Sequence, residues 1–179
     1  GILAVLMAAG CGKKEAEQAP AVDQSQLQTP ADGGWIELSS DSTLSVWSMQ
    51  APGAWKLTDG VMEKSEGGGY IWTKERFGDF VFDCEFKISE GGNSGIFFRT
   101  DDVNDPVQTG IEMQVYNIER KPSPVKNDCG AVYDLQEPSE YADKPAGEWN
   151  HVVITCKDNM ITVVMNDKQI VDMDINRWD

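Results

Sequence analysis

The chain has 179 residues, 40% of them hydrophobic, with 15 Lys and Arg residues against 30 Asp and Glu residues. This length suits one domain with an attached tail, and a mean hydropathy of −0.40 is typical of a globular protein. The formal net charge of −15 would repel a phosphate backbone and no basic stripe offsets it, which excludes nucleic-acid binding.

Residues 1–11 form an apolar run that ends in small residues before Cys11, as in a bacterial lipoprotein signal. The run is too short to span the hydrocarbon core of a bilayer, which takes about 20 residues. A buried helix is the alternative, but Met7-Ala-Ala-Gly-Cys11 followed by Gly-Lys-Lys disfavours it. The chain starts at Gly1 without a charged leader, so we expect a partial signal, lipidation at Cys11 and anchoring in the bacterial cell envelope, on the periplasmic or cell-surface side.

Residues 12–33 contain almost no large apolar side chain and have too little to bury to fold alone. We expect them to be a flexible tether that connects the membrane anchor to a folded domain at residues 34–179.

From Trp35 onward, short runs rich in Val, Ile, Phe, Trp, Tyr and Thr alternate with glycine-rich turns, and no convincing amphipathic helix is found. Phe80–Ile88 alternates strictly and is expected to turn one face to the core. Residues 151–156 and 160–165 predict a hairpin about Asp158-Asn159, with a further turn at Asn166-Asp167. The class is therefore all-β, a sandwich or jelly roll of antiparallel strands.

Two alternating runs, Asn93–Thr100 and Gly110–Asn117, carry the most informative polar residues. Successive side chains of a strand point to opposite faces. The core-facing set is then Ile96, Phe98, Ile111, Met113 and Val115, and the opposite set is Asn93, Phe97, Arg99, Glu112, Gln114 and Tyr116. The opposite set favours a polyhydroxylated ligand, and Gly95 leaves room for it to approach the backbone. The alternative is a solvated salt bridge between Glu112 and Arg99, which would contribute little.

The same runs carry a family resemblance. The segments N-S-G-I-F-F-R, G-I-E-M-Q-V, G-A-V-Y (130–133) and A-G-E-W-N (146–150), with W-K-L-T-D-G-V-M-E (55–63) and F-G-D-F-V-F-D-C-E-F (77–86), resemble the 3-keto-disaccharide hydrolase domain. The resemblance implies a concanavalin A-like jelly roll with its site on a concave sheet face. Because members of that family continue with further strands, it also implies that the domain is incomplete at its C-terminus.

The activity that this resemblance implies is cleavage of glycosides already oxidised to a ketone at C3, by hydrolysis or by elimination across C1 and C2. Glu112 is then the candidate base, Arg99 the clamp for developing negative charge, and Tyr116 or Tyr133 the proton donor. The substrate-binding candidates are Asn93, Gln114, Trp72 and Tyr133, with Trp72 stacking against a sugar. Some relatives use a divalent cation, so a cation is an open expectation.

Two other functions stay open. A non-catalytic carbohydrate-binding lipoprotein would use the same face, because this fold serves binding as widely as chemistry. A surface domain that contacts a protein partner is the third.

The remaining motifs have plainer interpretations. Cys84 is expected to be a packed free thiol, while Cys129 and Cys156 have the alternatives of a disulfide or free thiols. His151 is expected to be packed or solvated. The Asp101–Asp105 loop has oxygen ligands for calcium, although solvated loop charges are the more frequent case.

Overall fold

The computed structural model describes residues 4–5, 34–39, 44–64 and 69–177. Within them, antiparallel strands account for nearly all regular structure. The helical elements of this part are α1 (Pro106–Thr109) and a 3-10 turn at Ile175–Arg177. Among the described residues no helix is long and apolar enough to cross a membrane.

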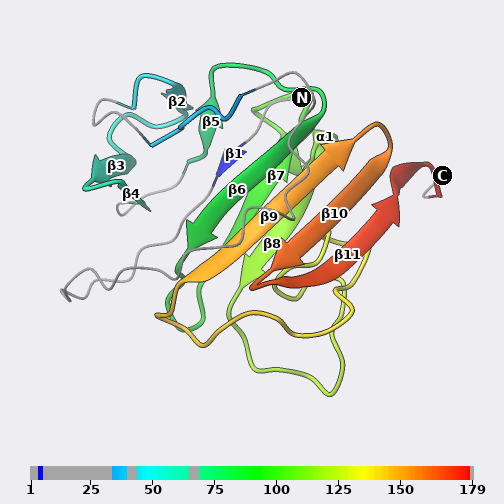
Figure 1. Cartoon of the computed structure of the whole chain (residues 1–179). Coiled ribbons are helices and arrows are strands. Elements are labelled where there is room, and N and C mark those ends of the chain that lie inside the picture. Colours follow the sequence, from blue (N-terminus) through cyan, green and yellow to red (C-terminus); the bar gives the residue numbers. More distant parts are fainter. Residues whose placement is uncertain (1–3, 6–33, 40–43, 65–68, 178–179) are drawn as a thin grey trace.

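Two sheets make up the body of the domain (Figure 1). One has the order β2-β5-β1-β7-β8 and the other β11-β10-β9-β6, all paired antiparallel. The bounds of the first are β2 (Trp47–Met49), β5 (Ile71–Thr73), β1 (Ala4–Val5), β7 (Asn93–Phe98) and β8 (Ile111–Tyr116). Those of the second are β11 (Lys168–Asp174), β10 (Met160–Met165), β9 (Asn150–Lys157) and β6 (Phe80–Phe86). A separate hairpin pairs β3 (Trp55–Thr58) with β4 (Val61–Lys64).

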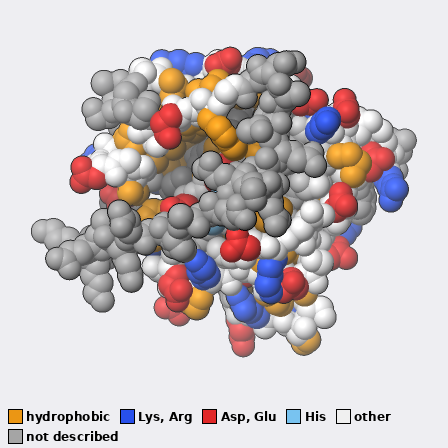
Figure 2. All heavy atoms as spheres, viewed as in Figure 1, with side chains coloured by type: hydrophobic (Ala, Val, Ile, Leu, Met, Phe, Trp, Pro, Cys, Tyr) orange, Lys and Arg blue, Asp and Glu red, His pale blue; other side chains and the backbone are white. Residues whose placement is uncertain are grey.

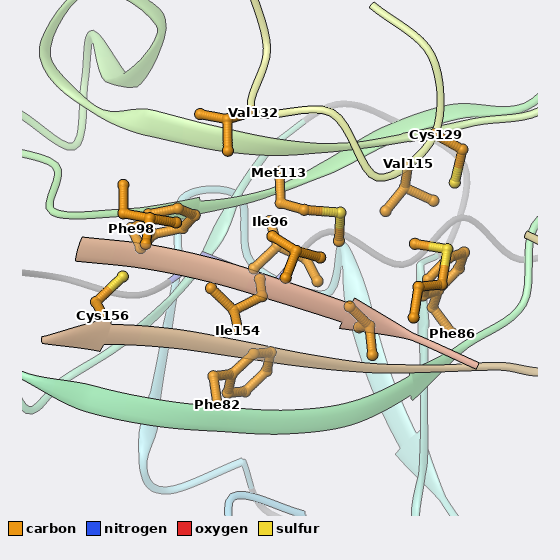
Figure 3. Packing of buried hydrophobic residues seen from close by; sticks show 14 of the residues in the cluster. Phe82, Phe86, Ile96, Phe98, Met113, Val115, Cys129, Val132, Ile154 and Cys156 are labelled. Atoms are coloured by element: carbon orange, nitrogen blue, oxygen red, sulfur yellow. The ribbon is translucent and has the colours of Figure 1, made fainter. Parts of the chain in front are cut away.

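The core lies between the two sheets, as alternation predicts. Ile96 and Phe98 of β7 and Met113 of β8 are fully buried, and they face Phe82 and Ile154 of the opposite sheet (Figure 3). Burying apolar surface is worth about 25 cal/mol per Å², so this layer is the main stabilising contribution. The expected all-β sandwich is confirmed, and so are the hairpin at Asp158-Asn159 and the turn at Asn166-Asp167.

The segment between β8 and β9 runs along the edge of β8 that does not pair with β7. The amide of Gln114 donates to the Ala131 carbonyl at 2.9 Å, and the amide of Tyr133 donates to the Glu112 carbonyl at 2.8 Å. Val132 bridges to Met113 and is fully buried. This added neighbour satisfies backbone groups of β8 that an edge strand would leave unpaired.

Two residues of the expected signal segment, Ala4 and Val5, lie within the part of the chain that the structure describes. Ala4–Val5 forms β1, which pairs on one side with β5 and on the other with β7, so these two residues share a sheet with the domain. Cys11 and residues 12–33 lie outside the described residues, and lipidation at Cys11 and the tether stay predictions.

The three described cysteines, Cys84, Cys129 and Cys156, are free thiols, so the disulfide alternative is not realised here. Burial raises the pKa of Cys129 and of Cys156 to about 12, which keeps both thiols protonated. His151 Nε2 lies 2.7 Å from an Asp83 carboxylate oxygen on the four-stranded sheet.

Candidate active site

The outer face of the five-stranded sheet brings residues of four strands into one row. Trp72 of β5 is paired with Ala4 of β1, Ala4 with Phe97 of β7, and Phe97 with Glu112 of β8. Residues that are directly opposite each other in antiparallel strands project from the same face. The row therefore runs from an indole, past a phenyl ring, to a carboxylate.

Glu112 lies over the backbone of Gly95. A Cβ placed on Gly95 would be 1.8 Å from Oε1 of Glu112 and 2.6 Å from its Cδ, so the carboxylate fills the space that a side chain would need. The strand conformation at Gly95 is one that any residue adopts. Glycine is therefore needed here for the close approach of Glu112, and not for the backbone conformation. Burial raises the pKa of Glu112 from 4.5 to about 7, since the charged form loses hydration.

Gln114 follows on the same face and is almost completely buried. Its Nε2 donates to Asn93 Oδ1 at 3.4 Å, whereas its Oε1 is buried without a hydrogen-bond partner among the described residues. An unsatisfied buried acceptor costs about 1–3 kcal/mol. Such an atom is satisfied when a water or a ligand hydroxyl donates to it, and the amide pair is therefore suited to bind a sugar hydroxyl.

Three aromatic rings form the other end of the row. The ring of Tyr70 packs against those of both Trp72 and Phe97, with its centroid 5.6 Å from each. Trp72 and Phe97 form a small buried cluster that is separate from the main core. The indole Nε1 of Trp72 is buried and has no acceptor in the described part of the chain. Trp72 and Phe97 are 5% and 3% exposed whereas Tyr70 is partly buried, so Tyr70 is the ring of this cluster that keeps surface for a ligand.

Tyr133 and Tyr116 lie at different places on this face. Tyr133 is beside Glu112 through its backbone, and its side chain is exposed. Tyr116 is half-buried and lines a small polar recess with Arg120, Tyr141 and Asp143. Along β8 it is four residues from Glu112, a separation of about 14 Å at the usual rise of a strand.

The position of Arg99 differs from the alternation count. β7 ends at Phe98, and Arg99 has a left-handed backbone with a φ of +52°. Its guanidinium pairs with Asp79 at 3.4 Å, immediately before β6 of the other sheet. The break in the strand redirects the side chain, so the described contacts form neither the expected clamp beside Glu112 nor the alternative, a salt bridge with Glu112.

Sequence reasoning missed Tyr70. The residue stands two positions before Trp72, and that spacing would have put both side chains on one face. It precedes the short strand β5 and follows the glycine cluster of residues 67–69, which reads as loop. The structure instead brings Tyr70 into the centre of the aromatic group.

The candidate calcium loop makes local bonds of its own. Asp102 Oδ1 accepts from the amide of Asn104 at 2.9 Å. In the part of the chain that the structure describes, no group of three or more His, Cys, Asp or Glu side chains is arranged to hold a metal ion. Figure 2 shows acidic, basic and apolar side chains interspersed over the described part of the face that it presents.

Comparison with known proteins now identifies the family. The 3-keto-alpha-glucoside-1,2-lyase-like domain matches residues 34–179, which is most of the chain. The chain belongs to this family. A crystal structure of a candidate glycosyl hydrolase from Parabacteroides distasonis agrees, with 30% identity, a TM-score of 0.72 and coverage of 82% of this chain and 75% of that one. The family that the sequence motifs indicated is thereby confirmed.

Two further relatives are less similar in sequence to this chain. A 3-keto-disaccharide hydrolase of Bacteroides thetaiotaomicron is 26% identical, in an alignment that covers 85% of this chain and 63% of that protein. This member of the family therefore spans less than two thirds of its curated relative. A second Parabacteroides distasonis structure, with 22% identity, a TM-score of 0.64 and coverage of 73% and 67%, supports the fold alone.

The raised pKa of Glu112 predicts how the stability of this family member depends on pH. Between pH 4.5 and 7 the folded carboxyl keeps its proton while the unfolded one releases it, so the folded state binds more protons and stability falls as pH rises. Glu112→Gln should remove this penalty. We expect the variant to be more stable than wild type above pH 7 and equally stable below pH 4.5, measured by urea unfolding across the range. A constant difference at all pH values would contradict the assigned pKa.

Proposed function

We propose that this chain cleaves glycosides that carry a ketone at C3 of the sugar, with Glu112 as the base. The observation that supports this most is the Glu112 carboxyl, whose pKa of about 7 suits proton removal at neutral pH. It stands in a row with apolar rings and beside a buried amide oxygen that has no hydrogen-bond partner among the described residues. Membership of the 3-keto-alpha-glucoside-1,2-lyase-like family points to the same substrate class.

The ketone is what makes one carboxylate sufficient. It acidifies the C2 proton, so Glu112 can accept that proton while the negative charge spreads to the ketone oxygen. The electron pair then forms the C1–C2 double bond as the bond from C1 to the leaving oxygen breaks, and that oxygen takes up a proton. Ordinary glycosidases instead need two carboxyl groups, one on each side of the scissile bond.

Substrate orientation is proposed to come from the groups around Glu112. Tyr70, which packs against the buried rings of Trp72 and Phe97 and is itself only partly buried, offers apolar ring surface to a sugar face. Gln114 is held by Asn93, and its Oε1, which has no partner in the part of the chain that the structure describes, can accept from a sugar hydroxyl. The backbone of Tyr133 lies beside Glu112 and its side chain is exposed, so its phenol can contact the leaving group.

Aglycone release tests the proposal. The protein is incubated with nitrophenyl 3-keto-glucoside and, as the matched control, with the unoxidised nitrophenyl glucoside. Release from the ketone alone is expected, because the unoxidised sugar has no acidic C2 proton. Release from neither compound by the folded wild-type protein would contradict the proposed activity.

The second candidate function is carbohydrate binding without turnover, which the partly buried Tyr70 ring and the Gln114 oxygen, unpartnered among the described residues, also suit. Calorimetric titration with an unoxidised disaccharide separates the two. Tight binding of the unoxidised sugar, with no release from the 3-keto compound, would favour this alternative.

Envelope anchoring is a further part of the proposal, based on the apolar run that ends at Cys11. Cys11→Ala removes the thiol that would carry the lipid. We expect the variant to move from the detergent phase to the aqueous phase in a detergent partition experiment on expressing cells. Equal partition of wild type and variant would exclude lipidation at this cysteine.

A further inference from the structure

Tyr70 is a phenol held within the aromatic group, at one end of the row that contains Glu112. Its ring packs edge-on against Phe97 and tilted against Trp72, at 5.6 Å in both cases. Phe97 is in turn directly opposite Glu112 in the β7–β8 pair. One residue therefore separates the ring of Tyr70 from the proposed base.

The backbone of Tyr70 is fixed on the other side. Its carbonyl accepts from the amide of Gln50 at 2.9 Å, and its amide donates to Oε1 of Gln50 at 3.2 Å. The side chain is held by two ring contacts and the main chain by two hydrogen bonds. A group with so few remaining conformations is suited to a positioned role in catalysis.

The electrostatic surroundings keep this phenol protonated. Burial raises the pKa of Tyr70, and the negative charge of Glu112 raises it further. A carboxylate that acts as a base therefore favours the neutral, proton-bearing form of the neighbouring phenol. The two groups are in complementary states at neutral pH, one able to accept a proton and the other able to donate one.

We infer that Tyr70 donates the proton that the leaving oxygen needs, an inference that rests on the proposed function. Glu112 takes the proton from C2, and the electron pair of that bond forms the C1–C2 double bond. The C1–O bond breaks, and the leaving oxygen receives the Tyr70 proton and departs as an alcohol. The phenolate of Tyr70 is then reprotonated by the Glu112 carboxyl, which restores both groups without any other reactant.

The other two tyrosines fit this step less well. Tyr133 is 43% exposed, so water competes for its phenol. Tyr116 is displaced from Glu112 by about 14 Å of strand and lines the recess with Arg120 and Asp143. Tyr70 differs from both because ring contacts hold it within the aromatic cluster.

Leaving-group dependence tests the inference. Tyr70→Phe keeps the ring that packs on Trp72 and Phe97 and removes the donating hydroxyl. We expect its kcat to fall by about 10²–10⁴ on a 3-keto disaccharide, whose alkoxide leaves poorly without a proton. On nitrophenyl 3-keto-glucoside, whose phenolate leaves readily, kcat should stay close to that of wild type. Tyr116→Phe is the matched control and should show no such difference between substrates, while Tyr133→Phe tests the competing donor.

The outcomes separate this inference from the function on which it rests. An equal loss on both substrates would mean that Tyr70 only supports the site, and a selective loss in Tyr133→Phe would move the donor there. Either result overturns the inference while the wild-type enzyme still cleaves 3-keto glycosides. Absence of turnover of both substrates by wild type would overturn the proposed function and the inference together.

Discussion

Glu112→Gln is expected to lower turnover of a 3-keto glycoside by about 10²–10⁴, the usual range for loss of a general base. The amide keeps the shape of the side chain over Gly95 but cannot accept the C2 proton. The expected change is in kcat, with substrate binding largely kept, because the lost interaction belongs to the transition state. Steady-state kinetics together with a binding titration of the variant measure the two separately.

The matched control is Glu63→Gln on β4, an exposed glutamate of the separate β3–β4 hairpin. It makes the same chemical change away from the row and should leave kcat unchanged. Wild-type kcat/KM should also rise with pH through about 7, as Glu112 loses its proton, and lose this limb in the Glu112 variant. Near-native turnover by Glu112→Gln would show that the base lies elsewhere.

Gly95→Ala is expected to reduce activity almost as strongly without touching a reacting group. The new methyl group would lie 1.8 Å from Oε1 of Glu112, so the carboxylate must turn away. A displacement of about 1 Å in a catalytic group can lower turnover by about 10²-fold. The displaced carboxylate would also regain water, so its pKa should fall and the acid limb of kcat/KM should move below pH 7.

Gly78→Ala provides the control, since a Cβ at that position has no described heavy atom within 4 Å. It should keep wild-type kinetics and unfolding midpoint. If Gly95→Ala also retains both kcat and the wild-type pH profile, the carboxylate over Gly95 is not the group that acts on substrate.

The strands were predictable because their signal is local. The alternation of Phe80, Phe82 and Phe86 fixes which face of β6 is buried, and the turn at Asp158-Asn159 fixes the β9–β10 pairing. The same alternation placed Glu112 and Gln114 on the face away from the core, which the structure bears out through the burial of Met113 and Val115 in the core. The two-residue period of a strand thus predicted its buried face, and the turns predicted which strands pair.

Arg99 and Tyr70 show where that reasoning stops. A single left-handed residue ends β7, and the guanidinium of Arg99 pairs with Asp79 at the other sheet. Tyr70 precedes its short strand, and its importance arises from the rings of Trp72 and Phe97, which lie 2 and 27 positions further along the chain. Local propensity does not encode contacts of this kind.

The sequence by itself therefore determined the all-β class, the core faces of the main strands and the family motifs that carry Glu112. Only the tertiary structure decided the chemical setting of that carboxyl: its position over Gly95, the burial that raises its pKa to about 7, and the phenol beyond Phe97. The physical reason is that alternation is a property of one strand, whereas desolvation and proximity depend on which other strands pack beside it.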